Sequence, residues 1–270
     1  MNYWTQSFES KNIYVAAHRG WPAKYPENTL PSFEAAAKLG VDQIETDVRI
    51  TKDGELVCIH DPKVDRTTNG AGLVCDLTLK ELRALDAGSW KAPEFEGTKI
   101  PTIYEFFDLM KQYDVKTLDI ELKEYPDGDW VETSHEVADR TLKIIDDYGY
   151  TDRVVINTFS AFLHEYIHEK YGNKYRLHTY WPAPIMGPEH PEQVYPYSYC
   201  CCLFGSDQNG IMATKDVFDY MRAIGVQPWA GAGCKTEEDV DAVIAHGADL
   251  ITVNNPDEIL AILRKKHYHE

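Results

Sequence analysis

The chain has 270 residues, of which 43% are hydrophobic, and a formal net charge of −17. This length is enough for one barrel-sized domain with a substantial core, so we expect a single domain over residues 1–270. The acidic balance argues against a nucleic-acid partner, because such binding depends on basic side chains that neutralise phosphates. A small anionic ligand would need a local positive centre.

The N-terminal stretch Met1 to Asn12 is polar and lacks a basic segment followed by an apolar run. No later run approaches the roughly eighteen apolar residues of a membrane span. We therefore expect no membrane span and a cytoplasmic protein. The six cysteines include the run Cys200–Cys202, and no Cys-x-x-Cys spacing occurs, so we expect thiols in the core rather than a zinc site.

Short apolar or β-branched runs alternate with longer amphipathic stretches, as expected for strands and helices around a parallel sheet. Eight strands are predicted, which suggests a closed barrel: Ile13–Ala17, Gln43–Ile50, Lys116–Lys123, Arg153–Asn157, Tyr175–Tyr180, Tyr199–Phe204, Val226–Ala230 and Leu250–Val253. The predicted helices are Leu30–Leu39, Ile103–Tyr113, Trp130–Tyr148, Phe162–Tyr171, Lys215–Ile224, Glu237–His246 and Asp257–Lys265. The proline-containing region Pro182–Pro196 is predicted to be mostly loop.

One segment is too long for a simple strand-to-helix connection. Residues 62–101 contain several glycines and separate an extended segment from the helix that follows Pro101. Before them, Thr51-Lys52-Asp53-Gly54 predicts a reverse turn, so the second strand returns as a hairpin ending at His60. We therefore predict a (β/α)8 TIM barrel with a small insertion after the second strand, at about residues 62–101, over the barrel mouth.

Two predicted strands carry acidic residues that share a face. Side chains two apart in a strand point the same way, so Glu45 lies with Asp47, and Glu121 lies with Lys123. Three carboxylates that converge at a barrel mouth repel one another unless protons or a divalent cation neutralise them. Mg²⁺ and Ca²⁺ prefer such oxygens, so the pattern predicts a divalent-cation site. The alternative interpretation is that Glu45 and Asp47 are solvent-facing strand residues. Asp119 lies deeper, where a buried polar contact is expected.

Two histidines stand at strand ends. His18 closes the first strand and His60 closes the hairpin, so both are expected near the mouth. Because an imidazole titrates near neutral pH, such a pair can divide the two proton transfers of a phosphoryl displacement. Asp61 either orients an imidazole or caps the next turn.

Two basic residues expected at the same barrel mouth can supply the positive charge that an anionic ligand needs. Arg19 offers a planar fork for phosphate oxygens and Lys123 a mobile point charge. Arg19 also has a structural alternative, a salt bridge with Glu27, and the two roles are compatible.

The chain resembles the glycerophosphodiester phosphodiesterases along nearly its whole length. The resemblance is carried by His18-Arg19-Gly20, Pro26-Glu27-Asn28-Thr29, Ile44-Glu45-Thr46-Asp47-Val48, Thr51-Lys52-Asp53-Gly54, His60-Asp61, Arg66-Thr67-Thr68, Ile100-Pro101-Thr102 and Glu121-Leu122-Lys123. It implies a (β/α)8 barrel with a small insertion after the second strand. Matched residue by residue, it also implies a metal at Glu45, Asp47 and Glu121, an acid–base pair in His18 and His60, and phosphate contacts from Arg19 and Lys123.

The implied reaction is metal-dependent hydrolysis of a glycerophosphodiester to glycerol 3-phosphate and an alcohol, with one divalent cation, Mg²⁺ or Ca²⁺. Attack by water and attack by the neighbouring glycerol hydroxyl, through a cyclic phosphate, both fit these residues. A phosphodiesterase for lysophospholipids would use the same metal and histidines beside an apolar groove, for which the region Tyr180–Tyr199 is a candidate. A barrel that only binds a phosphate ester is the third hypothesis, and it would not require both histidines.

The C-terminal part departs from the usual family pattern. The seventh strand reads Trp229-Ala230-Gly231-Ala232-Gly233, in which Trp229 alone matches, and Asn254-Asn255-Pro256 stands where an Asp is frequent. Trp229 is expected either to form an apolar wall for the substrate or to pack in the core. The tail Lys265–Glu270 is expected to be a frayed helix end, far from the motifs.

Overall fold

The structure is a computed structural model that describes residues 12–187, 195–203, 213–231 and 233–270. Parts of four predictions lie outside these residues: the polar N-terminal stretch up to residue 11, residues 188–194 of the proline-containing loop, the strand end at Phe204, and Ala232.

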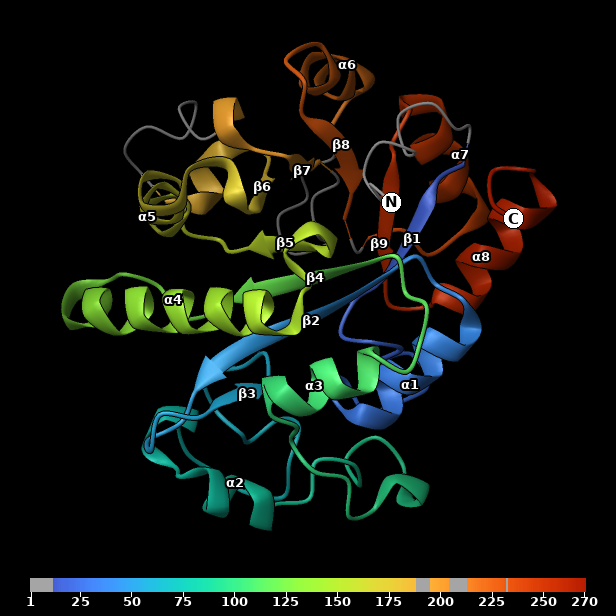
Figure 1. The fold of residues 1–270 in the computed structure, drawn as a ribbon. Coiled ribbons are helices and arrows are strands. Elements are labelled where there is room, and N and C mark those ends of the chain that lie inside the picture. The colour runs from blue at the N-terminus through green and yellow to red at the C-terminus, as the bar shows by residue number, and fades with distance from the viewer. Residues whose placement is uncertain (1–11, 188–194, 204–212, 232) are drawn as a thin grey trace.

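The strands form a closed ring, as Figure 1 shows from one side. The strands described are β1 (Tyr14–Ala17), β2 (Gln43–Ile50), β3 (Leu56–Cys58), β4 (Thr117–Leu122), β5 (Val154–Asn157), β6 (Arg176–Tyr180), β7 (Cys200–Cys202), β8 (Gln227–Ala230) and β9 (Leu250–Val253). Their order is β1-β9-β8-β7-β6-β5-β4-β2-β3, and the pairing of β1 with β2 closes the ring. All neighbours pair in parallel except β2 and β3. The predicted (β/α)8 TIM barrel is confirmed.

The helices pack outside the ring (Figure 1), except the short helix Leu79–Ala84, which belongs to the insertion after β3. They are α1 (Leu30–Leu39), α2 (Leu79–Ala84), α3 (Ile103–Met110), α4 (Val131–Tyr148), α5 (Ala161–Tyr171), α6 (Lys215–Ala223), α7 (Glu237–His246) and α8 (Pro256–Lys265). Threonine capping boxes begin α2, α3 and α7, and left-handed glycines end α1, α4 and α7. Among the described helices, none has both the length and the apolar composition to cross a membrane.

Two kinds of apolar packing hold the ring. The larger core lies between strands and helices and includes Phe33, Phe106 and Phe107. A small cluster of five buried residues contains Ala16, Val155, Cys200, Trp229 and Leu250. All six cysteines are free thiols. Cys200, Cys201 and Cys202 are buried, which confirms the predicted place of this run in the core.

The segment after β3 has a hydrophobic core of its own. Val57 and Ile59 pack there against five residues of the insertion: Val64, Val74, Leu82, Ala87 and Ile100. Lys91 of this segment donates to the carbonyl oxygens of Pro22 and Ala23 in the loop after β1, which places the insertion beside the carboxyl ends of the strands. β3 ends at Cys58, so the predicted strand to His60 was two residues too long.

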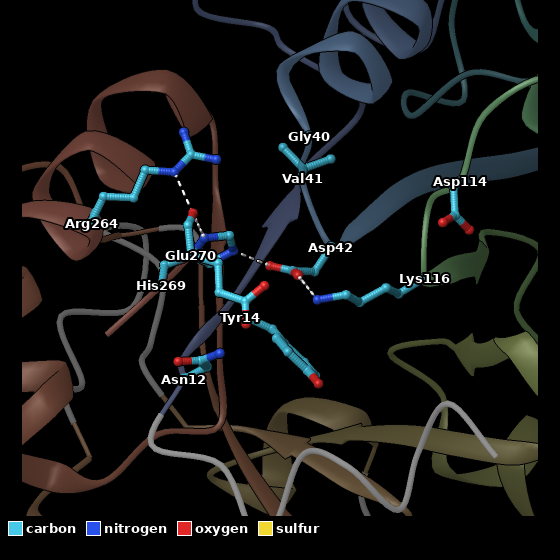
Figure 2. Close-up of a pocket in the computed structure, with 10 residues that line it drawn as sticks. All are labelled: Asn12, Tyr14, Gly40, Val41, Asp42, Asp114, Lys116, Arg264, His269 and Glu270. Carbon is cyan, nitrogen blue, oxygen red and sulfur yellow. Dashed lines mark hydrogen bonds and ion pairs between the residues drawn. The ribbon is translucent and has the colours of Figure 1, made fainter. Parts of the chain in front are cut away.

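The expectation of a frayed C-terminal tail was wrong. The Tyr268 carbonyl accepts from the backbone N–H of Ile13 at 2.7 Å, and Nε2 of His269 lies 2.8 Å from Oδ2 of Asp42. His269 and Asp42 line a pocket of about 230 Å³ at the amino end of the barrel, where Figure 2 shows His269, Asp42 and Lys116 in a row. The tail is far from the motifs, as expected, but it is docked.

Candidate active site

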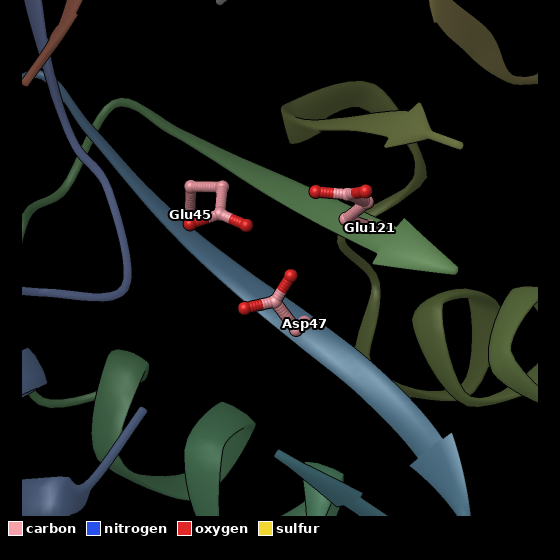
Figure 3. Close-up of side chains that lie close together, drawn as sticks. All are labelled: Glu45, Asp47 and Glu121. Carbon is pink, nitrogen blue, oxygen red and sulfur yellow. The ribbon is translucent and has the colours of Figure 1, made fainter. Parts of the chain in front are cut away.

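Three carboxylates meet at the carboxyl ends of β2 and β4. Glu45 and Asp47 alternate along β2, and β4 pairs with β2 in a register that sets Glu121 opposite Asp47. One oxygen from each of the three side chains lies within 4.8 Å of the others, and Figure 3 shows the carboxylates turned toward one another. The residues are 2%, 0% and 3% exposed, in chain order. The predicted convergence is present, and the cluster has the oxygen donors that a divalent cation prefers.

The charges of this cluster are unequally compensated. Burial and the neighbouring charges of Asp47 and Glu121 raise the pKa of Glu45 well above its usual value. Burial likewise raises the pKa of Glu121, against the opposing charge of Lys123. Burial opposes ionisation of Asp47 too, yet Lys123 and Arg19 outweigh it and lower the pKa of Asp47. Within the described residues, the buried Oε1 of Glu45 has no hydrogen-bond partner, as expected of an oxygen that binds a cation.

Two cationic side chains border the acids. Nζ of Lys123 lies 3.1 Å from Oδ1 of Asp47 and also pairs with Glu121. Nε of Arg19 lies 3.2 Å from Oδ2 of Asp47, and its Nη1 donates to Glu27 at 2.9 Å. The predicted salt bridge between Arg19 and Glu27 is therefore present, and both predicted phosphate contacts stand beside the carboxylate cluster.

The turn after β1 has a conformation that suits its sequence. Arg19 has a φ of 57°, and its backbone N–H donates to Oε2 of Glu45 at 2.7 Å. Gly20 follows with a φ of 85°, and a Cβ atom there would lie 2.4 Å from Oγ of Ser32. Only glycine fits this position without displacing α1, which explains the residue type in His18-Arg19-Gly20.

His18 is buried and bound at Nδ1. The distance from Nδ1 to Oδ1 of Asn254 is 2.7 Å, and because an amide oxygen only accepts, Nδ1 carries the proton. Burial, reinforced by the charge of Arg19, lowers the pKa of His18 to about 4. The imidazole is therefore neutral at pH 7, with the lone pair on Nε2.

His60 has a different partner at the same ring nitrogen. Its Nδ1 lies 2.7 Å from Oδ1 of Asp61, and hydrogen bonds from Arg66 are the main reason that the pKa of Asp61 falls to about 2. An ionised carboxylate accepts, so Nδ1 carries the proton here as well. Of the two predicted roles of Asp61, orientation of an imidazole is the one that this contact supports.

The sequence reasoning assigned no role to Asn28 or Asn254, although both stood in quoted stretches. Asn28 has a φ of 55°, and its Nδ2 donates to Oδ2 of Asp47 at 2.6 Å. Its Oδ1 accepts from the Thr46 hydroxyl at 2.9 Å. Asn28 thus orients Asp47. The signal available was the Pro26-Glu27-Asn28-Thr29 motif, since asparagine tolerates the left-handed region.

Asp119 and Trp229 both contact His178. Oδ2 of Asp119 is 2.8 Å from Nδ1 of His178, which is the deep polar contact that was predicted. Trp229 is 2% exposed, its Nε1 donates to Gln227 at 3.1 Å, and its ring meets His178 edge to face. These contacts are those of a packed core residue, and the substrate contact of Trp229 stays a prediction.

Comparison with known proteins identifies the family of the chain. Residues 18–258 match the model of the glycerophosphoryl diester phosphodiesterase family. A glycerophosphodiester phosphodiesterase of Caldanaerobacter subterraneus subsp. tengcongensis is 33% identical over 263 residues, covering 93% of this chain and 98% of the relative. Another from Bacillus altitudinis is 30% identical over 254 residues, covering 92% and 97%.

Solved structures share the fold. A phosphodiesterase from Oleispira antarctica, in complex with the product sn-glycerol-3-phosphate, superimposes with a TM-score of 0.81 at 24% identity, over 94% of this chain and 97% of that chain. A glycerophosphodiester phosphodiesterase structure from Agrobacterium tumefaciens gives a TM-score of 0.72 at 21% identity, over 92% and 99%. The chain therefore belongs to the glycerophosphoryl diester phosphodiesterase family and is an enzyme of that class.

Proposed function

We propose that the chain hydrolyses glycerophosphodiesters to glycerol 3-phosphate and an alcohol, with a divalent cation, Mg²⁺ or Ca²⁺, at Glu45, Asp47 and Glu121. In this proposal His18 and His60 are the acid–base pair. The observation that carries it is the excess of buried acid over buried base at the mouth. Three carboxylates face the cations Lys123 and Arg19, and Arg19 also pairs with Glu27.

A buried carboxylate oxygen without a partner is costly, and a bound cation removes that cost. Oε1 of Glu45 is such an atom. When bound, the cation supplies Lewis-acid polarisation of the phosphate and a template for the attacking oxygen. Arg19 and Lys123 border the same carboxylates and offer a fork and a point charge to the non-bridging phosphate oxygens.

The two histidines perform the proton transfers in this proposal. Because Nδ1 of each is engaged, each presents Nε2 to the reaction. One Nε2 takes the proton of the attacking hydroxyl as the new P–O bond forms. The other imidazole enters the step with a second proton, on Nε2, and gives that proton to the alcohol oxygen as the old P–O bond breaks. Attack by water and attack by the glycerol hydroxyl both use the pair in this way.

The test is release of glycerol 3-phosphate from glycerophosphocholine and glycerophosphoethanolamine, after chelation and again with Mg²⁺ or Ca²⁺. Glu45→Ala is run alongside, with Glu136→Ala as the matched control, because Glu136 is an exposed acid on α4. We expect metal-dependent release by the wild type and the control, and none by Glu45→Ala.

Release without added metal in the chelated enzyme would contradict the metal site. A panel that includes lysophosphatidylcholine separates the substrate classes. If the protein hydrolyses only that lipid, the lysophospholipid hypothesis is correct and the glycerophosphodiester hypothesis is wrong. If it binds all the diesters without turnover, the hypothesis of a binding barrel is correct.

A further inference from the structure

The insertion contributes an arginine that bridges two acids of the mouth. Nε of Arg66 donates to Oδ2 of Asp61 at 2.6 Å and its Nη2 to Oδ1 at 3.1 Å. Its Nη1 and Nη2 also donate to the two oxygens of Glu27, at 2.8 Å and 2.7 Å. One guanidinium therefore holds two carboxylates through four hydrogen bonds.

Each of these carboxylates also contacts a residue that has a role in the proposed reaction. Oδ1 of Asp61 lies 2.7 Å from Nδ1 of His60, and Oε1 of Glu27 accepts from Nη1 of Arg19 at 2.9 Å. The hydrogen-bonded chain His60–Asp61–Arg66–Glu27–Arg19 thus joins the proton-transfer group to the phosphate contact.

We propose that Arg66 is a positioning residue of the active site, which acts through Asp61 on His60 and through Glu27 on Arg19. This inference rests on the proposed function, because it concerns how the same histidine and arginine are held. Arg66 is not a catalytic residue in this proposal, since its guanidinium is occupied by the two acids.

The geometry distinguishes this bridge from an ordinary surface ion pair. Exposed pairs contribute little, and the Arg66 side chain is 45% exposed. Its partners are less accessible, at 10% for Glu27 and 25% for Asp61. Both are held in the two-pronged manner that restricts rotation of a carboxylate. What Arg66 contributes is orientation more than stability.

Loss of Arg66 would leave Asp61 and Glu27 without their shared cation. The Asp61 carboxylate would then rotate freely, and His60 would lose the fixed acceptor that keeps the proton on Nδ1. Lysine cannot replace the fork, because one ammonium group cannot hold both oxygens of both carboxylates. Arg66 is followed by the buried Thr67 and Thr68, and the Thr68 hydroxyl donates to the carbonyl oxygen of Val64, a residue of the insertion core.

The kinetic test compares Arg66→Met, Arg66→Lys, Asp61→Asn and the double variant Arg66→Met/Asp61→Asn on glycerophosphocholine. Arg83→Met is the matched control, since Arg83 is another insertion arginine that pairs with Glu105 and the Ile100 carbonyl, away from His60. We expect Arg66→Met to lower kcat by about tenfold to a hundredfold, the loss typical of a misplaced catalytic group. Arg66→Lys should restore only part of it, and Arg83→Met should stay near wild type.

The effect of Arg66→Met on kcat should be much smaller in the Asp61→Asn background, because a residue that acts through another is not additive with it. Equal losses in both backgrounds, or full activity of Arg66→Met or Arg66→Lys, would overturn the proposal.

A second readout needs no turnover. Nitrogen-15 chemical shifts of His60 in the metal-free protein report which ring nitrogen carries the proton. We expect the Nδ1–H form in the wild type and in Arg83→Met, and a mixture of tautomers in Arg66→Met. An unchanged tautomer would contradict the inference. If the wild type hydrolyses no diester, the proposed function fails, and this measurement still decides whether Arg66 orients His60.

Discussion

Strand β2 has a buried acid near each of its ends, and the two acids differ in how completely their charge is compensated by neighbouring groups. Asp42, just before the strand, accepts from the Val15 N–H at 2.8 Å and contacts Lys116 at 2.7 Å and His269 at 2.8 Å. Asp47, toward the other end, shares its cations with Glu121 and Glu27.

The difference separates a structural acid from a functional one. At the amino end, charges and hydrogen bonds are complete, so Asp42 joins the docked tail to the barrel. At the carboxyl end, part of the negative charge of the carboxylates is uncompensated, and Oε1 of Glu45 has no hydrogen-bond partner among the described residues. Like charges that are buried together lower stability unless a ligand joins them, and such concentrations are typical of functional sites.

The largest expected effect is on activity, and it contrasts the two acids directly. Asp47→Asn should lower kcat/KM for glycerophosphocholine by about a thousandfold or more, because a bound metal contributes several kcal/mol of transition-state stabilisation. Asp42→Asn should keep activity within about threefold, because it lies at the opposite end of the barrel. Equal losses in the two variants would erase the distinction between the ends.

The second contrast is between the effects on activity of removing His60, at the carboxyl end of the barrel, and His269, at the amino end. His60→Ala should lower kcat by about a hundredfold to ten-thousandfold, the range of general acid–base catalysis, whereas His269→Ala should leave kcat unchanged. Steady-state kinetics at saturating metal measures both. A His60→Ala enzyme with nearly normal kcat would place the proton transfer elsewhere.

Local patterns in the sequence were enough to predict the barrel and the carboxylate cluster. The alternation of Glu45 and Asp47 is a property of any strand, and parallel strands bring Glu121 to the same edge. Contacts that depend on the closed ring were beyond such reasoning. His18 meets Asn254 across 236 positions, and Asn28 reaches Asp47 only through a left-handed turn.

The C-terminal tail shows the same limit. Its charged residues have no apolar period that would predict burial, so it was expected to fray. Its docking depends on Ile13 and Asp42, which lie at the other end of the chain. Tertiary contacts of this kind override local propensity.

A bound divalent cation should stabilise the folded protein only through the carboxylate cluster at the carboxyl ends of the strands. A cation that binds only the folded chain raises the free energy of unfolding by about 2.7 kcal/mol at 100 times its Kd. We expect this rise in the wild type and in Asp42→Asn, and little of it in Glu121→Gln. Urea unfolding at several Mg²⁺ or Ca²⁺ concentrations measures it. A full rise in Glu121→Gln would show that the stabilising cation binds outside the cluster.

The smallest effect concerns pH at the amino end. The hydrogen bond to Asp42 raises the pKa of His269, so its contribution is complete below the ordinary histidine pKa of about 6.5 and is lost as pH rises through the folded value. Although burial opposes it, His269 and Lys116 lower the pKa of Asp42, which keeps that acid charged in the same window. His269→Ala should therefore lower the free energy of unfolding by about 1.5 kcal/mol near pH 5.5, and by less at alkaline pH. Urea unfolding at several pH values checks this, and in an Asp42→Asn background the pH dependence of the loss should disappear. A loss that is the same at every pH would mean that His269 stabilises the tail through its uncharged contacts and not through the ion pair with Asp42.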